Sequence, residues 1–524
     1  MRCGTARPPG FAGRLTNRFA GRLTNGFAGR LTNGFAVAQA MVSVHGCIVV
    51  FALVAALTMA NFVLSVPLGE GNDETNHVIR VASLLDGQIF GQRRAAPVGD
   101  DGTRFVEAGF VVSSSYLDAM QYRQRGPDGH PQPIGRLDVA AQDRLTWGGE
   151  ARFVEASNTV LYPPLLYLPA ALGVRAGQIA QLGPAAAIKL GRLFNAIFYV
   201  SIGSTALAIA TRGRLAILTL LLTPMSLFLA SCISLDGPII ALAALASAAL
   251  GRPPESARAP VLHWTGIICL SLIAIAKPPY IPLAGLVWLA ARRLPTWQWR
   301  DALALGVTIA LPVLWAGLAG HEASVPFGRD AYRPGPLWSG AADAIFHTTD
   351  PAAQATVLLA DPLRVLTVPM HTFIAEFGLM CREVVGVLSW RDVPLPAWLY
   401  TVWFGVILAM VALDAVMPGG GSQKERSWRT AFGAQMVLWA CLVGSMLSIY
   451  LALYVTWTAV GSALVSGVQG RYLIPLLLFV PLALPWRPLA EGRLHKLAML
   501  VPLALAAIDC VVLPSVILGR YYMQ

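Results

Sequence analysis

Residues 41–80 read MVSVHGCIVVFALVAALTMANFVLSVPLGEGNDETNHVIR, and this stretch joins a long apolar run to a polar cluster. The run over about 42–66 contains no Asp, Glu, Lys or Arg, and it exceeds the roughly 20 apolar residues that a membrane-spanning helix needs. A cleavable signal peptide is the alternative. Because the stretch lacks a convincing small-residue cleavage site, we predict a retained first span with a polar site directly after it.

The rest of the 524-residue chain has the same apolar character, with 56% hydrophobic and 13% charged residues and a mean hydropathy of +0.59. A soluble domain carries about 25% charged residues, so we exclude soluble folds and predict an all-α polytopic membrane protein. Apolar runs follow near 186–210, 215–231, 237–250, 262–276, 280–291, 301–319, 397–417, 431–455, 472–486 and 497–518. Together with the first run they predict roughly eleven transmembrane helices, with YPPLLYLPAALGV (162–174) as a re-entrant or interfacial helix.

Residues 1–40 contain six arginines and no acid, and they repeat one octad three times, from Phe11, Phe19 and Phe27. Eight residues with one Phe and one Leu are too few to bury a face against a neighbouring repeat. We therefore predict a disordered basic tail over 1–40 and a transmembrane domain over 41–524, for which Met41 could be the true start.

Basic residues recur in every second short connection, near 212–214, 252–258, 292–300, 424–429 and 487–496. The positive-inside rule places these connections and the N-terminus in the cytoplasm. The long segments 67–185 and 320–396 are then extracytoplasmic, and 67–185 is a large first outer loop. We attribute the net charge of +11 to this pattern and predict membrane lipid, not nucleic acid, as the partner of the basic residues.

The first candidate site is the cluster GNDETNHVIR (71–80) after the first span. If Asn72 caps a helix, then Asp73, His77 and Arg80 share one face, which brings an acid, an imidazole and a cation together at the membrane surface. A carboxylate there, from Asp73 or Glu74, could act as a general base. The alternative is that both acids only complement the positive end of a short helix.

The second candidate site consists of side chains at outer span ends, where charges are costly unless they face a polar cavity or reach the interface. Proline-rich helix breaks at Pro163-Pro164, Asp236-Gly237-Pro238 and Pro278-Pro279 lie at the same predicted level. We predict substrate binding by Lys189, Arg192, Asp236, Lys277, Arg471 and Tyr472, although snorkelling alone could explain the lysines. Arg471 is the strongest candidate, because a guanidinium suits a pair of phosphate oxygens.

Scattered cysteines and histidines form no metal-ligand spacing, and no phosphate-binding or dinucleotide-binding glycine motif occurs. We therefore predict neither a metal site nor a cofactor.

Eight segments in order resemble the bacterial integral-membrane domain-of-unknown-function family 2142, over about residues 42–518. They are NDETNHVIRVASLLDGQIF (72–90), YPPLLYLPAALG (162–173), RLFN (192–195), TPMSLFLASCISLDG (223–237), AKPPYIPL (276–283), DPLRV (361–365), GVLSWRDVPLPAWLY (386–400) and VGSALVSGVQGRYLIPLL (460–477). The resemblance implies a GT-C-like fold in the bacterial cytoplasmic (inner) membrane.

GT-C enzymes are glycosyltransferases that take a sugar from a polyprenyl-phosphate carrier on the outer membrane face. The resemblance therefore implies a polyprenyl-phosphate-linked sugar donor, a glycan or lipid acceptor, and a base on Asp73 or Glu74. We predict that His77 and Arg80 bind substrate beside this base, and the resemblance implies that the cations bind the carrier phosphate. A flippase of lipid-linked saccharides and a non-catalytic polysaccharide assembly factor are the alternatives. The shared face with His77 and Arg80 favours Asp73 over Glu74.

Overall fold

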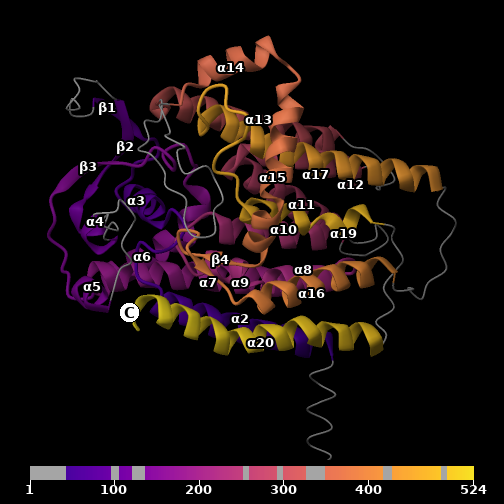
Figure 1. The fold of residues 1–524 in the computed structure, drawn as a ribbon, viewed down its shortest axis with the longest axis horizontal. Helices are drawn as coiled ribbons and strands as arrows, with labels where there is room; N and C mark the ends of the chain where they lie inside the picture. The colour runs from indigo at the N-terminus through magenta and orange to yellow at the C-terminus, as the bar shows by residue number, and fades with distance from the viewer. Residues whose placement is uncertain are drawn as a thin grey trace, which may run out of the picture.

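The computed structural model describes residues 43–95, 106–120, 136–251, 259–291, 299–325, 349–416, 428–484 and 493–523. Within these ranges the chain is mostly helical, as Figure 1 shows. The predicted repeat tail 1–40 lies outside the described residues.

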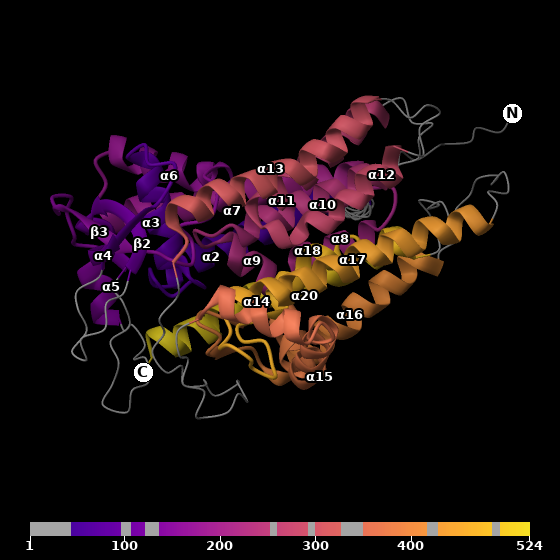
Figure 2. The same cartoon turned by 90° about the horizontal axis from the view of Figure 1, so that it is seen from above.

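Six helices in these ranges are long and apolar enough to cross a membrane. They are α2 (Val44–Ser65), α7 (Pro184–Ile209), α13 (Trp299–Ala323), α16 (Ala397–Val416), α17 (Trp428–Thr456) and α20 (Arg493–Tyr521). In Figure 2 these helices run along the length of the molecule. A bent pair, α14 (Pro351–Ala360) and α15 (Arg364–Val385), turns by 105° and raises the number of candidate spans to seven if it counts as one.

Shorter elements occupy the other predicted spans, because prolines interrupt the helical hydrogen bonding there. These elements are α8 (Arg214–Leu222), α9 (Pro224–Ala230), α10 (Asp236–Leu250), α11 (Ala259–Ala276), η2 (Pro278–Ala284), α12 (Gly285–Ala291), η3 (Gly470–Leu473), α18 (Ile474–Leu477) and α19 (Val480–Ala483). Every residue of α8, α9 and α10 is buried, so these three helices form the centre of the bundle. A membrane protein built from several apolar helices is confirmed, whereas the number of eleven spans stays a prediction.

The segment after α2 folds into a small polar unit at one end of the bundle, which we call the sheet end (Figure 2). Its elements are α3 (Glu74–Leu85), β1 (Gln92–Ala95), β2 (Val106–Ser113), α4 (Ser114–Met120), α5 (Arg136–Gln142), β3 (Ala151–Glu155), η1 (Leu165–Tyr167) and α6 (Leu168–Ile179). The strands form an antiparallel sheet in the order β1-β2-β3, in which Gly109 of β2 lies opposite Gln92 and Glu155. This sheet adds a feature that the all-α prediction did not contain.

A hairpin of β4 (Val387–Leu388) and β5 (Val393–Pro394) joins α15 to α16 and reaches the loop after α2. Ser389 donates a hydrogen bond to Glu70, 2.9 Å away, and the Trp390 indole donates to the carbonyl of Gly69, also 2.9 Å away. Tyr521, at the end of α20, donates to the same Glu70 carboxylate at 2.9 Å. The beginning, middle and end of the transmembrane domain therefore meet at the sheet end.

Candidate active site

Six polar side chains from four separate segments meet at the sheet end, and we call them the charged cluster. The loop after α2 and helix α3 supply two of them, α10 and the α11–η2 junction one each, and η3 the last two. The members are Asp73, His77, Asp236, Lys277, Arg471 and Tyr472.

Arg471 is the centre of the charged cluster and bridges its two carboxylates. Its Nη2 atom lies 2.8 Å from Oδ2 of Asp73, and its Nη1 atom lies 3.4 Å from Oδ2 of Asp236. The Arg471 side chain is only 3% exposed, whereas that of Asp73 is 35% exposed. Asp73 is therefore the carboxylate of the pair that a molecule from outside could reach.

Lys277 adds the second cation, and the ring of Tyr472 lies beside both cations. The ammonium of Lys277 pairs with Asp236 and lies 4.9 Å from the centroid of the Tyr472 ring. The Arg471 guanidinium lies 5.1 Å from the same centroid. Burial alone would lower the pKa of Lys277, but the adjacent Asp236 carboxylate raises it above its usual value. Lys277 is therefore charged at neutral pH.

His77 is an uncharged member of the cluster. Its Nδ1 atom lies 2.6 Å from the Tyr167 hydroxyl, and its ring stacks on Tyr162 with centroids 6.2 Å apart. Burial lowers the pKa of His77 to about 4, although the carboxylates of Asp73 and Asp236 oppose this effect. His77 is thus held by the Tyr167 hydroxyl and carries no charge at neutral pH.

Asp73 adopts a backbone conformation that is uncommon for a residue with a side chain. It precedes the first residue of α3 with φ at 54° and makes no side-chain capping bond. The predicted cap at Asn72 is therefore wrong by one residue, because the helix begins at Glu74. Such a left-handed residue persists only where its surroundings hold it, and here the Asp73 carboxylate turns to Arg471 instead of capping its own helix.

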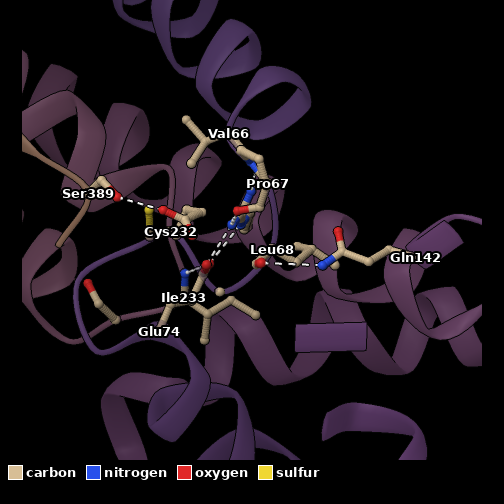
Figure 3. A network of polar contacts seen from close by, with 12 residues as sticks. Val66, Pro67, Leu68, Glu74, Gln142, Cys232, Ile233 and Ser389 are labelled. Atoms are coloured by element: carbon tan, nitrogen blue, oxygen red, sulfur yellow. Dashed lines mark hydrogen bonds and ion pairs between the residues drawn. The ribbon is translucent and has the colours of Figure 1, made fainter. Parts of the chain in front are cut away.

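Glu74, the neighbouring acid, is fully buried and bound to Arg192 of α7. Its two carboxylate oxygens lie 2.7 and 2.5 Å from Nε and Nη2 of Arg192, and one also accepts from the Ile233 amide at 3.0 Å. Arg192 further donates to the carbonyls of Val66 and Pro67 at 2.7 and 3.0 Å. Figure 3 shows Glu74 with the Val66–Pro67 and Cys232–Ile233 backbone around it.

Glu74 and Arg192 thus tie the loop after α2 to the centre of the bundle. Both oxygens of this carboxylate are already engaged, so its position suits a structural role rather than that of a base.

A model of the family of predicted membrane proteins DUF2142 matches residues 56–480, most of the chain. The chain belongs to this family. No curated protein and no solved structure matches it. The match contains every member of the charged cluster, so the site is part of the DUF2142 region.

Two other predicted site residues of this DUF2142 chain lie apart from the charged cluster. Arg80 donates to the carbonyls of Tyr162 and Ile89 at 3.1 and 2.8 Å and also to Ser83 and Gln88, so it anchors loops to α3. Lys189 is partly exposed and pairs with Asp143 at 2.7 Å. In the part of the chain that the structure describes, no contact joins either side chain to the cluster.

Three residues that contact the charged cluster or its backbone were not predicted from the sequence. Tyr162 and Tyr167 pack on His77, although the YPPLLY run suggested only a membrane segment. Glu383 of α15 accepts from the Gly470 amide at 2.6 Å, directly before Arg471, and also pairs with Arg391 at 2.6 Å. No sequence spacing relates Glu383 to Gly470, because the contact is made only by tertiary folding.

Proposed function

We propose that this protein is a membrane glycosyltransferase of the GT-C type. It moves a sugar from a polyprenyl-phosphate carrier to a glycan or lipid acceptor on the extracytoplasmic face of the bacterial inner membrane. The charged cluster is the active site, and the sheet end faces outward. The N-terminus is cytoplasmic, and the chain crosses the membrane about eleven times when the short buried helices are included.

This proposal rests on a buried hydrogen-bond donor of Arg471 that has no partner in the part of the chain that the structure describes. Its side chain is buried, yet its Nε–H has no hydrogen-bond partner among the described residues. An unpaired buried donor is costly, and a phosphate oxygen would satisfy it. Lys277 lies on the other side of Asp236 and would add a second positive charge. A guanidinium with an ammonium nearby suits a phosphate group.

The proposed reaction uses this arrangement. An acceptor hydroxyl gives its proton to the Asp73 carboxylate while its oxygen forms a bond to the anomeric carbon of the donor sugar. The bond from that carbon to the phosphate oxygen breaks, and the electron pair leaves with the polyprenyl phosphate. Arg471 and Lys277 stabilise this departing charge. Phosphate at the unpaired Nε leaves the pair between Nη2 and Oδ2 of Asp73 in place, and the other oxygen of this 35%-exposed carboxylate accepts the proton.

The proposal is tested in cells that lack the gene and are complemented with wild type, Asp73→Asn or Arg471→Ala. Mass spectrometry of lipid-linked sugars and surface glycans is the measurement. We expect a glycan short of one sugar and accumulation of the matching polyprenyl-phosphate sugar in the deletion strain. Neither variant should restore the glycan, although both should reach normal membrane levels.

Two control variants match these changes in chemistry. Asp143→Asn and Arg175→Ala alter exposed side chains of the polar unit outside the cluster, and both should restore the glycan. Full rescue by Asp73→Asn and Arg471→Ala would rule out the site. Unchanged glycan chemistry with a lipid-linked sugar retained in the inner leaflet would instead indicate a flippase.

A further inference from the structure

Helices α14 and α15 hold the backbone that leads to Arg471. Gln354 of α14 accepts from the Gly461 amide at 2.8 Å. Thr372 and Glu383 of α15 accept from the amides of Val465 and Gly470 at 2.8 and 2.6 Å. Arg364, at the start of α15, donates to the Gly461 carbonyl at 3.1 Å. The segment 461–470 therefore lies along one face of this helix pair and ends at the cluster.

The opposite face of the same pair is apolar and exposed. Its six large side chains, which we call the lipid stripe, are 53–80% exposed: Leu359, Leu363, Leu366, Met370, Ile374 and Phe377. Along α15 they recur every three or four residues, which places them on one side of the helix. An apolar row of this length requires a covering phase, since soluble surfaces rarely leave such patches in water.

Both ends of α15 lie at the same end of the bundle. At its beginning, Arg364 reaches the hydroxyl of Tyr454, in the last turn of α17, at 3.5 Å. At its other end, Glu383 pairs with Arg391 of the hairpin whose Ser389 bonds Glu70, just after α2. In Figure 2, α15 is seen end-on while α16, α17 and α20 run lengthwise. The helix therefore runs across the direction of the spans.

We propose that α14 and α15 form a platform lying along the outer surface of the bilayer. The lipid stripe enters the acyl chains, as in other amphipathic interfacial helices, and the opposite face holds Arg471 at the depth of lipid phosphates. The bent pair is then not a seventh span. The identity of the ligand at Arg471 rests on the proposed function, whereas the position of the platform does not.

Depth measurements on the full chain in lipid nanodiscs test the platform. A fluorescent amino acid replaces Leu366, Met370, Ile374 or Phe377, and nitroxides at shallow or deep acyl positions quench it. Glu155, exposed in β3, is the control position. We expect strong shallow quenching of equal size at all four stripe positions and none at 155.

Other outcomes overturn the platform. Quenching that deepens steadily from 366 to 377 would indicate a span, and no quenching would indicate water or a protein partner. A stripe that is protected only when two copies share a disc would indicate a dimer interface.

A second measurement tests the link between platform and site. Binding of polyprenyl phosphate and of inorganic phosphate is compared for wild type, Met370→Asp/Ile374→Asp, Arg471→Ala and Ile179→Asp. Ile179 is exposed in the polar unit and serves as the control. We expect the stripe variant to bind polyprenyl phosphate about tenfold more weakly and inorganic phosphate as wild type does, because only the lipid must be presented at the right depth.

The same comparison separates the two proposals. Wild-type binding of polyprenyl phosphate by Arg471→Ala would refute the proposed function, while the depth result would stand. Equal loss of both ligands in the stripe variant would refute the link, since a lipid-specific role predicts loss of one ligand only.

Discussion

Two adjacent acids, Asp73 and Glu74, have opposite environments. The Asp73 side chain is 35% exposed and shares Arg471 with Asp236, whereas that of Glu74 is 0% exposed and is closed around Arg192. Asp73 has a left-handed backbone with φ at 54°, whereas Glu74 is the first residue of α3. Asp73 is therefore accessible from solvent, whereas Glu74 is held in a buried ion pair.

Separate substitutions of Glu74 and Asp73 should distinguish an effect on stability from an effect on activity. Glu74→Ala leaves the buried Arg192 without its ion-pair partner, so we expect about 3–5 kcal/mol of destabilisation. Asp73→Asn should retain the folding stability and lose activity by about a hundredfold or more. Thermal unfolding in nanodiscs and the glycan assay measure the two effects. An active Asp73→Asn protein, or a Glu74→Ala protein as stable as wild type, would contradict this assignment.

His77 should make stability depend on pH. Because its pKa is about 4 in the folded chain and about 6.5 in an unfolded one, the unfolded state binds more protons between these values. The contribution of His77 to the free energy of unfolding is therefore fully present above pH 6.5. It is lost as the pH decreases toward 4, and the loss is about 2 kcal/mol at pH 5. The unfolding midpoint of His77→Gln should fall less steeply between pH 7.5 and 5. Exposed His321→Gln is the control, and parallel curves for wild type and His77→Gln would contradict the prediction.

At the scale of elements, η3 is positioned by close contact with α15. A Cβ added at Gly470 would lie 2.1 Å from the carbonyl oxygen of Met380 and 2.9 Å from Cβ of Glu383. No side chain fits in this space. The approach of the two backbones, together with the bond from the Gly470 amide to Glu383, sets the direction in which Arg471 leaves η3.

Gly470→Ala should therefore displace Arg471. We expect about 1–3 kcal/mol of destabilisation from overpacking and weaker binding of polyprenyl phosphate, because the guanidinium moves away from Asp73. Gly378→Ala is a matched control on α15, where an added Cβ meets nothing within 4 Å. Unfolding midpoints and ligand binding measure both variants. Wild-type binding by Gly470→Ala would show that this contact does not position the site.

At the scale of the whole molecule, the cluster contains residues from positions 73 to 472, and these lie together at one end of the bundle. The lengths and directions of α2, α7, α16, α17 and α20 place one end of each helix there. The basic connections of the sequence predict that the sheet end faces outward.

Side-specific labelling tests this orientation. Cysteines introduced at Glu155 and Lys189, which are at least partly exposed in the polar unit and at the start of α7, should react with a membrane-impermeant maleimide from outside intact cells. Cysteines in the connection 252–258 should react only after the membrane is opened. The reverse pattern would place the cluster in the cytoplasm and remove the basis for an extracytoplasmic reaction.

Much of the fold could be predicted from the amino-acid sequence, since long apolar runs such as 42–66, 186–210 and 397–417 became α2, α7 and α16. The spans at 215–231 and 472–486 were less predictable, because prolines divide them into short buried helices. The sheet was missed because its strands are short and partly exposed, with weak alternation.

Several site residues were also predictable as candidates, because charged side chains are conspicuous at span ends. Asp73, Asp236, Lys277 and Arg471 did meet. Arg192 and Glu74 carry the same charges and were also predicted as site residues, yet they pair with each other in the interior.

The sequence alone determined that the chain lies in a membrane, where most of its helices run and which residues carry charge, because hydropathy and composition act locally along the chain. Only the tertiary structure decided which charges meet. The bond from Gly470 to Glu383 joins residues 87 positions apart, and the pair of Arg471 with Asp73 joins residues 398 positions apart. The left-handed backbone at Asp73 and the crossing of α15 accompany these contacts. Burial makes ion pairing necessary at these contacts, because an ionised group inside the protein is costly without a partner.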